Sequence, residues 1–230
     1  MKVGIIGAGG IAVTMARTLN QMEDATAYAV ASRSLEKAET FAKEHQVEKA
    51  YGSYEEMLQD PEVDLVYVAT PHSHHYECMK LALCYGKPVL CEKAFTANAE
   101  QAEEILSISE EKKLFVGEAM WTRFLPSRKM IDEVVSSGEI GQVHMITANL
   151  GYDIRMVERL RNPALAGGAL LDVGIYPLTF IRMITSSKIT SIDTSCVKLE
   201  TGVDAQNTVT FVFEDGCMAT MHSSMLGGTE

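Results

Sequence analysis

The sequence has few cysteines, and their arrangement argues against several kinds of site. The five cysteines of the 230-residue chain are an odd number and scattered, with no CxxC pair and no metal-ligand spacing. We interpret them as reduced thiols of a cytoplasmic protein, and we expect no metal site. No basic segment precedes an apolar one at the N-terminus, so a signal peptide is not expected. We find no apolar run that approaches the roughly 18 residues of a membrane helix, so no membrane partner is expected.

Basic residues are scarce as well. Lysine and arginine number 20 against 31 aspartates and glutamates, which gives a net charge of −11 and a pI of about 5.0. An acidic surface repels a phosphodiester backbone, so we expect no nucleic-acid partner. A bound phosphate would need backbone N–H groups or a well-placed arginine. The chain is large for one core and comfortable for two, and its 47% of hydrophobic residues is typical of a globular protein.

The first half of the chain alternates apolar strands with helices. We predict strands at 3–6, 25–31, 64–70, 88–93 and 114–119, and helices at 10–22, 35–45, 54–58, 75–85 and 99–112. Strands that are apolar on both faces are typical of a parallel sheet covered by helices on both sides. Residues 1–119 are therefore predicted to form a doubly wound α/β domain.

The pattern changes after about residue 120. We predict a helix at 125–136, another near 170–185, and longer alternating strands at 143–152, 189–199, 207–216 and 217–225. The "EDG" turn at 214–216 favours a hairpin. Residues 120–230 are therefore predicted to form an α+β domain with an open, mostly antiparallel sheet.

The stretch "GAGGIA" at 7–12 has the pattern G-x-G-x-x-A between a strand and a helix. Gly7 would make the tight turn, Gly9 would admit a pyrophosphate, and Ala12 would let helix and strand pack closely. The pyrophosphate would then lie against Gly7, Ala8, Gly9, Gly10 and Ile11 at the helix N-terminus. The alternative is a strand-to-helix turn that binds no ligand.

The end of the second strand indicates which dinucleotide would bind. An NAD site usually has an acidic residue there, but this chain has "ASRS" at 31–34. Ser32 and Arg33 can instead hold a 2′-phosphate, and Lys37 adds charge one helical turn later. We therefore favour NADP over NAD, the alternative being that Arg33 is an ordinary surface residue.

"VLCEKAF" places Glu92 and Lys93 at the carboxyl end of a parallel strand, where ligands bind in open α/β sheets. A partly desolvated lysine exchanges protons more easily near neutral pH. The alternative is a lysine on the rim of the sheet.

"GGALLDVGIYPL" at 167–178 is the second candidate for chemistry. Asp172 and Tyr176 are four residues apart and would share one face of a helix that Pro177 makes irregular. Asp172 could bind a substrate hydroxyl, and Tyr176 could pass a proton if an ammonium group lies nearby. The alternative is a structural aspartate near a helix start and a buried tyrosine satisfied by a hydrogen bond.

"TPHSHHYE" begins with Thr70 and Pro71 and contains His72, His74 and His75. A zinc site needs three or four ligands at suitable spacing, and further ligands are missing here. We interpret the segment as a loop beside the cofactor, with His75 near the start of the next helix.

"EAMWTRFLP" at 118–126 lies where the two predicted domains join. Trp121, the only tryptophan, and Arg123 could line a cofactor and substrate cleft. The alternative is packing between the domains.

Together these motifs resemble the Gfo/Idh/MocA oxidoreductases, in the order of the family and over essentially the whole chain. "EAMWTRF" and "GGALLDVGIYPL" further resemble the subgroup of dimeric dihydrodiol dehydrogenases, which also oxidise D-xylose with NADP. The resemblance implies a Rossmann domain, an open-faced second domain whose sheet often forms a homodimer, and hydride transfer to or from a sugar or polyol. It also implies that Lys93 is the catalytic lysine, Tyr176 the acid/base and Asp172 the residue that orients the substrate.

The chain departs from the family at two points. Ala94 stands where the family usually has a proline after the lysine, so the backbone that aims Lys93 could differ. Members are also longer, so we expect a truncated C-terminus and an incomplete second sheet. Our hypothesis is an NADP-dependent dehydrogenase of a sugar, polyol or cyclic diol bound between the domains. The alternatives are a regulatory protein that binds NADP without turnover and a methyltransferase-like protein that binds another adenine nucleotide.

Overall fold

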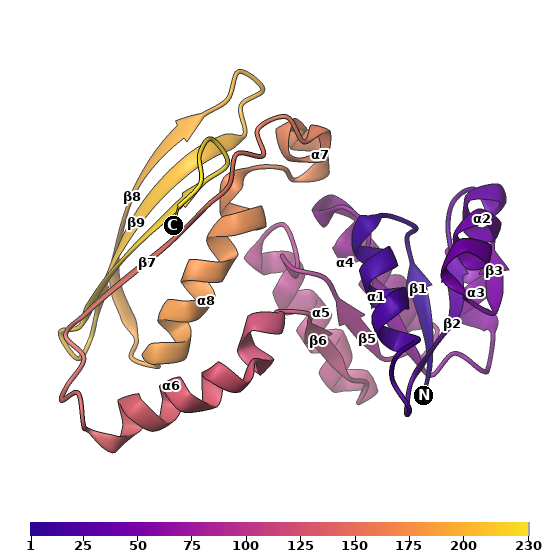
Figure 1. The fold of residues 1–230 in the computed structure, drawn as a ribbon, viewed down its shortest axis with the longest axis horizontal. Helices are drawn as coiled ribbons and strands as arrows, with labels where there is room; N and C mark the ends of the chain where they lie inside the picture. Colours follow the sequence, from indigo (N-terminus) through magenta and orange to yellow (C-terminus); the bar gives the residue numbers. More distant parts are fainter. Residues whose placement is uncertain (230) are drawn as a thin grey trace. The chain divides into compact units, whose positions relative to one another are not determined.

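The computed structural model describes residues 1–229 and shows two compact units, Met1–Ala119 and Met120–Glu230 (Figure 1). Each unit has its own sheet and its own buried core.

The first unit contains a parallel six-stranded sheet, which confirms the predicted fold class. Its strand order is β3-β2-β1-β4-β5-β6. All strands are parallel, and successive strands are added on one side of β1 up to β3 and on the other side from β4 onward, so the strand order reverses between β1 and β4. Ligands in such sheets bind beyond the carboxyl ends of the strands at this reversal. The strands are β1 (Lys2–Ile6), β2 (Thr26–Ala31), β3 (Lys49–Tyr51), β4 (Leu65–Val68), β5 (Val89–Cys91) and β6 (Val116–Glu118).

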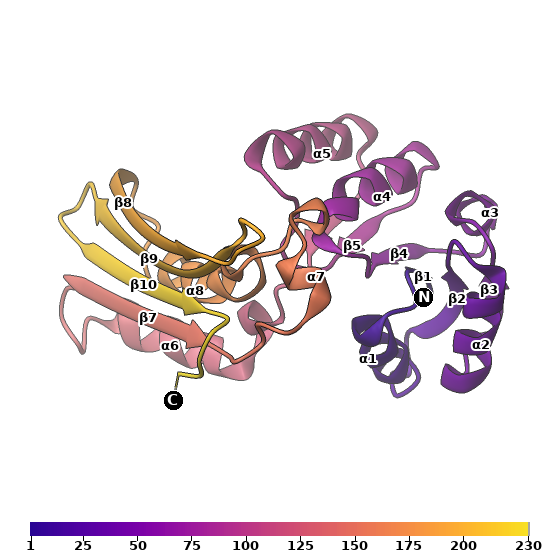
Figure 2. The same cartoon turned by 90° about the horizontal axis from the view of Figure 1, so that it is seen from above.

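Helices cover both faces of this sheet, because its central strands are apolar on both sides (Figure 2). Ala16 of α1 and Phe41 of α2 pack on one face, whereas Met57 of α3, Met79 of α4 and Ile105 of α5 pack on the other. The helices are α1 (Gly10–Leu19), α2 (Leu35–His45), α3 (Tyr54–Gln59), α4 (His72–Cys84) and α5 (Ala99–Lys112).

Side-chain caps fix the start of three of these helices. Ser34, Ser53 and Asn98 each accept a hydrogen bond from the backbone N–H three residues later. Such caps satisfy donors that have no partner within the helix, which is why short polar residues begin helices. Helices α2 and α5 therefore begin and end where the sequence predicts.

The second unit is built on a four-stranded mixed sheet of order β7-β10-β9-β8. Strand β7 is parallel to β10, and the other pairs are antiparallel, including the β9–β10 hairpin predicted at "EDG". Helix α8 lies along one face, where Ile181 packs against Phe211 and Met221, and the other face is exposed (Figures 1 and 2). The elements are η1 (Trp121–Phe124), α6 (Pro126–Ser137), β7 (Met145–Gly151), α7 (Glu158–Arg161), η2 (Pro163–Leu165), a π-helical turn η3 (Leu170–Gly174), α8 (Ile175–Ile184), β8 (Ile189–Lys198), β9 (Asp204–Phe213) and β10 (Met218–Ser224).

Three predictions about elements were wrong. Helix α4 begins at His72 rather than at residue 75, because Pro71 occupies the position before the helix, where its fixed φ suits the turn. Strand β3 and helix α7 were missed, since segments of three and four residues carry too little periodicity to be detected.

The prediction of no membrane-length apolar run was also wrong. The helical stretch Pro163–Ile184 spans 22 residues and contains an 18-residue window with a mean hydropathy of 1.6, which is long and apolar enough by length and composition to cross a membrane. Core helices pass the same test, and within this unit Ile181 of the stretch is fully buried against the sheet. The glycines and Asp172 divide the run in the sequence and made it look shorter than it is.

Asp60 anchors a polar network at one end of the first sheet. Its Oδ2 accepts hydrogen bonds from Lys49 Nζ at 2.8 Å, Tyr51 OH at 2.6 Å and Tyr28 OH at 3.2 Å, and its Oδ1 accepts from the Glu62 N–H at 2.9 Å. Burial raises the pKa of Asp60, but the bonds from Lys49 and Tyr51 outweigh it and hold this pKa well below its usual value. The carboxylate therefore joins β2, β3 and the end of α3.

We expect Asp60→Asn to lower the free energy of unfolding at pH 7 by about 2 kcal/mol, because hydrogen bonds to a buried charged acceptor are lost. Since the folded-state pKa is depressed, this stabilisation is fully present above the unfolded pKa of about 3.9 and is lost progressively as the pH falls from there through the lower folded-state pKa. Guanidinium unfolding at pH 7 and at about pH 2.5 measures both effects. Glu110→Gln, on the exposed side of α5, is the control, and an equal loss in both variants would contradict the prediction.

Candidate functional site

The turn after β1 requires a glycine at its first position. Gly7 has a φ of +103°, which side chains rarely adopt, and a Cβ there would lie 2.8 Å from the Ala69 carbonyl oxygen. The Gly7 N–H donates to the Ala31 carbonyl at 2.9 Å. The turn is therefore held against the ends of both β2 and β4, the neighbours of β1.

The glycines that follow leave the start of α1 open. A Cβ on Gly9 or Gly10 would meet no atom within 4 Å, and no side chain caps the helix. The backbone N–H groups of the first turn are thus available to an anion. A hollow of about 720 Å³ lies beside them, lined on one side by Ala8 and Gly9 and on the other by residues of α2 that include Lys37. Ile11 is exposed on α1 nearby. These features fit a bound pyrophosphate.

Ser32, Arg33 and Lys37 follow the end of β2. Ser32 is half-buried, and Arg33 and Lys37 are exposed, with no carboxylate among residues 32–35. Burial raises the pKa of both Tyr54 and Cys78, and the positive charge of Arg33 offsets a small part of that rise at each group. An arginine at this place can pair with a 2′-phosphate.

The "TPHSHH" segment ties two strand ends together. His75 is buried, and its Nε2 lies 2.8 Å from the Thr70 carbonyl oxygen while its Nδ1 lies 2.7 Å from the Ala94 carbonyl oxygen. Burial lowers the pKa of His75, against the raising effect of the two carbonyls. His75 thus connects the end of β4 to the segment that carries Lys93.

The loop interpretation of this segment was wrong, because Pro71 precedes the helix and the histidines lie in the first turn of α4. His72 is buried, with its ring against that of His75 at 5.7 Å between centroids. Within residues 1–229, no three His, Cys, Asp or Glu side chains are grouped so that they could hold a metal ion.

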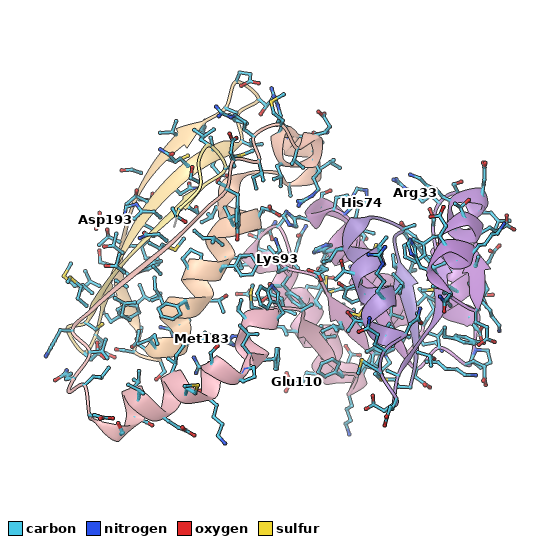
Figure 3. All side chains as sticks on the ribbon, viewed as in Figure 1. Arg33, His74, Lys93, Glu110, Met183 and Asp193 are labelled. Atoms are coloured by element: carbon cyan, nitrogen blue, oxygen red, sulfur yellow. The ribbon has the colours of Figure 1, made fainter. Side chains whose placement is uncertain are left out.

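The "EK" strand end is supported from within the sheet. The buried Tyr67 hydroxyl of β4 donates to Glu92 Oε1, and the Lys93 N–H donates to Glu92 Oε2 at 3.3 Å. Burial and the neighbouring Glu92 raise the pKa of Tyr67 well above its usual value, so the phenol remains a donor. Lys93 is half-buried. Arg33, His74 and Lys93, which are labelled in Figure 3, follow the carboxyl ends of β2, β4 and β5. Because the strands are parallel, these ends lie on the same side of the sheet.

In the second unit, Asp172 lies on the π-helical turn before α8 and is buried. Its Oδ1 accepts a hydrogen bond from Arg159 Nη1 of α7 at 3.0 Å. Sequence reasoning did not single out Arg159. The signal available was three arginines within seven residues, 155–161, in an otherwise acidic chain.

The irregular turn rests on polar groups of the sheet. Asp204 Oδ2 accepts from the Leu170 N–H and from Asn207 Nδ2, both at 2.6 Å, and Asn207 Nδ2 also lies 3.3 Å from Ser223 Oγ. Asp204 packs so closely that a Cβ on Gly168 would lie 2.0 Å from its Oδ1. The π-helical turn at Leu170–Gly174 lies before Pro177 in the chain. The irregular backbone is therefore associated with the contacts of Asp204 as well as with the proline.

Tyr176 lies one residue into α8 and is half-buried. The indole N–H of Trp121 is 3.3 Å from its hydroxyl, and the two rings make an edge contact at 6.4 Å between centroids. A hollow of about 310 Å³ lies beside Tyr176, with Leu150 and Phe180 in its lining. Arg123, in the same short helix as Trp121, is exposed. The structure thus brings Trp121 to the predicted acid/base and leaves Arg123 on the surface.

Two family models match the chain. The model described as "Oxidoreductase family, NAD-binding Rossmann fold" (GFO_IDH_MocA) matches residues 1–119, and the "GFO/IDH/MocA C-terminal domain" matches residues 129–229.

Individual relatives agree with these matches. The chain is 40% identical over 220 residues to trans-1,2-dihydrobenzene-1,2-diol dehydrogenase of Bos taurus, covering 94% of this chain and 65% of that protein. It is 42% identical to D-xylose 1-dehydrogenase (NADP(+)) of Hypocrea jecorina, covering 79% and 52%. A 3-ketoreductase from Actinomadura kijaniata, solved with NADP and TDP-benzene, superposes with a TM-score of 0.91 at 25% identity, covering 100% and 72%. The chain therefore spans about half to two thirds of the length of these two curated relatives.

We expect Gly7→Ala to destabilise the first unit by about 2 kcal/mol, because an alanine there has a strained φ and meets the Ala69 carbonyl. Gly10→Ala is the matched control, since its Cβ would enter open space at a helix start. Thermal unfolding of both variants measures the difference. Equal melting temperatures would show that the turn relaxes without cost.

Proposed function

The chain belongs to the GFO/IDH/MocA oxidoreductase family, and from that premise we propose that it is an NADP-dependent dehydrogenase of a sugar, polyol or cyclic diol. One observation carries the proposal. Three features follow strand ends on the carboxyl side of one parallel sheet: a glycine-rich turn at Gly7–Gly10, Arg33 in a segment with no carboxylate at 32–35, and Lys93. That edge is where such sheets bind ligands.

Residues of the first unit fit NADP. Gly7, Gly9 and Gly10 would admit the pyrophosphate, and the uncapped start of α1 would supply N–H groups to it. Arg33, with Ser32 and Lys37, would hold the 2′-phosphate. The relatives support this choice, since the Hypocrea enzyme is named for NADP(+) and the Actinomadura structure holds NADP.

Further residues of the first unit are proposed to line the nicotinamide end. Thr70, Pro71, His72 and His75 follow β4, and Glu92 follows β5. We also assign Trp121 and Arg123 to the cofactor side of the site.

The bound cofactor would supply a hydride acceptor at the nicotinamide for alcohol oxidation. The chain's own residues would handle the proton and the oxygen. We assign Tyr176 as the base that takes the hydroxyl proton, and Lys93 as the cation that holds the oxygen as negative charge develops. Asp172 would accept a hydrogen bond from a substrate hydroxyl and so orient the ring. In reduction, the same tyrosine would return the proton.

We also propose that the protein is a homodimer in the cytoplasm. The face of the second sheet opposite α8 includes the exposed side chains of Met145 and Met218, which are paired across β7 and β10 and give the kind of apolar surface that interfaces bury. All five cysteines are free, which suits a reducing compartment.

We expect the 230-residue chain to bind NADPH more tightly than NADH. Arg33→Ala should weaken NADPH binding about tenfold to a hundredfold, because a charge-assisted pair with the 2′-phosphate is lost, and should leave NADH binding unchanged. Fluorescence titration of each nucleotide measures both affinities. Arg17→Ala removes the same charge from the exposed side of α1 as a control. Equal losses for both nucleotides would exclude Arg33 from the phosphate site.

We expect the chain to oxidise members of a panel of sugars and diols with NADP⁺. The turnover rate should fall by more than about a hundredfold in Lys93→Met and in Tyr176→Phe, because the first loses the cation that stabilises the oxygen and the second loses the group that exchanges the proton. NADPH binding should persist in both variants. Lys112→Met on α5 is the control. Binding without turnover in the unaltered chain would instead favour a regulatory protein, and retained turnover in Lys93→Met would refute the catalytic assignment.

A further inference from the structure

Side chains hold the backbone at Lys93, because this residue lies just beyond the strand ladder. At the end of β5, the Glu92 N–H still donates to the Val68 carbonyl of β4 at 3.0 Å. The Lys93 N–H donates instead to the carboxylate of Glu92 at 3.3 Å, and the next carbonyl, that of Ala94, lies 2.7 Å from His75 Nδ1. The position of Lys93 therefore depends on how firmly these side chains are themselves held.

Tyr67 fixes the carboxylate of Glu92 from inside the sheet. It lies on the central strand β4, buried in the cluster that includes Ile5 and Ala16, and its hydroxyl donates to Glu92 Oε1. Glu92 uses its other oxygen, Oε2, for the Lys93 N–H. One carboxylate thus joins a buried phenol to the backbone of the proposed catalytic lysine.

The hydroxyl of Tyr67 is not needed to fill the core. A phenylalanine has the same ring, and a buried hydroxyl costs free energy unless it is hydrogen-bonded. Burial raises the pKa of Tyr67 well above its usual value, so the hydroxyl keeps its proton and acts as a donor. The contribution of this hydroxyl is therefore to hold Glu92 rather than to pack the sheet.

We propose that Tyr67 is a positioning residue for the dehydrogenase reaction, acting through Glu92 to hold the backbone from which Lys93 reaches the reacting oxygen. The inference rests on the proposed function, since it takes Lys93 as the cation that stabilises that oxygen. A displacement of about 1 Å at such a group can slow a reaction about a hundredfold. The cofactor phosphates would bind elsewhere, at Gly7–Gly10 and Arg33, so the cofactor affinity should not depend on Tyr67.

The first test is Tyr67→Phe in the full 230-residue chain, which removes only the hydroxyl. We expect kcat for sugar and diol oxidation with NADP⁺ to fall about tenfold, because Lys93 is less firmly placed. The substrate KM and the Kd of NADPH should stay within about twofold of those of the unaltered chain. A rise in KM or in this Kd with kcat unchanged would overturn the inference.

Tyr28→Phe is the matched control, because Tyr28 is also a buried tyrosine of the same sheet and donates to a carboxylate, Asp60 Oδ2, at 3.2 Å. Its melting temperature should fall, whereas its kcat should stay within about twofold of that of the unaltered chain. Equal losses of kcat in Tyr28→Phe and Tyr67→Phe would give Tyr67 a role in stability alone and overturn the inference.

A double-mutant cycle tests whether Tyr67 acts through Glu92. In a Glu92→Ala background the carboxylate is gone, so adding Tyr67→Phe should lower kcat by less than about twofold further. A further tenfold loss in the double variant would show that Tyr67 acts by another route and would overturn the inference.

Amide hydrogen exchange at Lys93, followed by NMR, tests the positioning without turnover. Exchange of the Lys93 N–H should be about tenfold faster in Tyr67→Phe and unchanged in Tyr28→Phe, because only the first variant loosens its acceptor. Unchanged exchange in Tyr67→Phe would overturn the inference and leave the proposed function standing. No oxidation of any sugar or diol by the unaltered chain would overturn the proposed function and the kinetic part of the inference, while the exchange rates would still decide whether Tyr67 holds the Lys93 backbone.

Discussion

The close approach of backbone at Gly7 is the constraint on which the first unit depends. Its N–H bonds to the end of β2, and its missing Cβ leaves room for the carbonyl that ends β4. Three neighbouring strands therefore finish at one point of the sheet, at the reversal between β1 and β4. The residues that follow those strands, among them Arg33 and Thr70, are brought to one edge by that arrangement and not by any contact between their own side chains.

In the second unit, polar contacts with the sheet stabilise the irregular helical turn that carries Asp172. A π-helical turn breaks the regular ladder of backbone bonds, and Asp204 accepts the Leu170 N–H that precedes Asp172. Asn207 and Ser223 extend this support across the covered face of the sheet. Gly168 and Gly174 have no room for side chains against these polar groups. The glycines of "GGALLDVG" therefore serve packing against the sheet, and the carboxylate of Asp172 is positioned as a result.

Positively charged residues are fewer than acidic ones in this chain, and two of those near the proposed chemistry, Lys93 and Arg159, are positioned by buried neighbours. Lys93 follows a strand end that Tyr67 and His75 tie to β4, through Glu92 and the Ala94 carbonyl. Arg159 is held at Asp172 by the packing of α7. Buried Tyr67 and His75 and the packing of α7 thus help to position two cations that remain exposed or half-exposed, an arrangement that avoids the cost of burying an unpaired charge.

The sequence by itself determined the parallel sheet, the glycine turn, the absence of a carboxylate near Arg33, and the positions of Lys93, Asp172 and Tyr176, because these depend on local periodicity and on residue type at fixed spacing. Only the tertiary structure decided the partners of those residues. Arg159 with Asp172, Trp121 with Tyr176, and Tyr67 with Glu92 are separated by 13, 55 and 25 residues. Local pattern carries no information about which distant side chains meet. The helix start at His72 and the membrane-length run at 163–184 were also misjudged from local pattern. Helix α4 begins directly after Pro71, and the glycines and Asp172 divide in the sequence a run that continues in the folded chain.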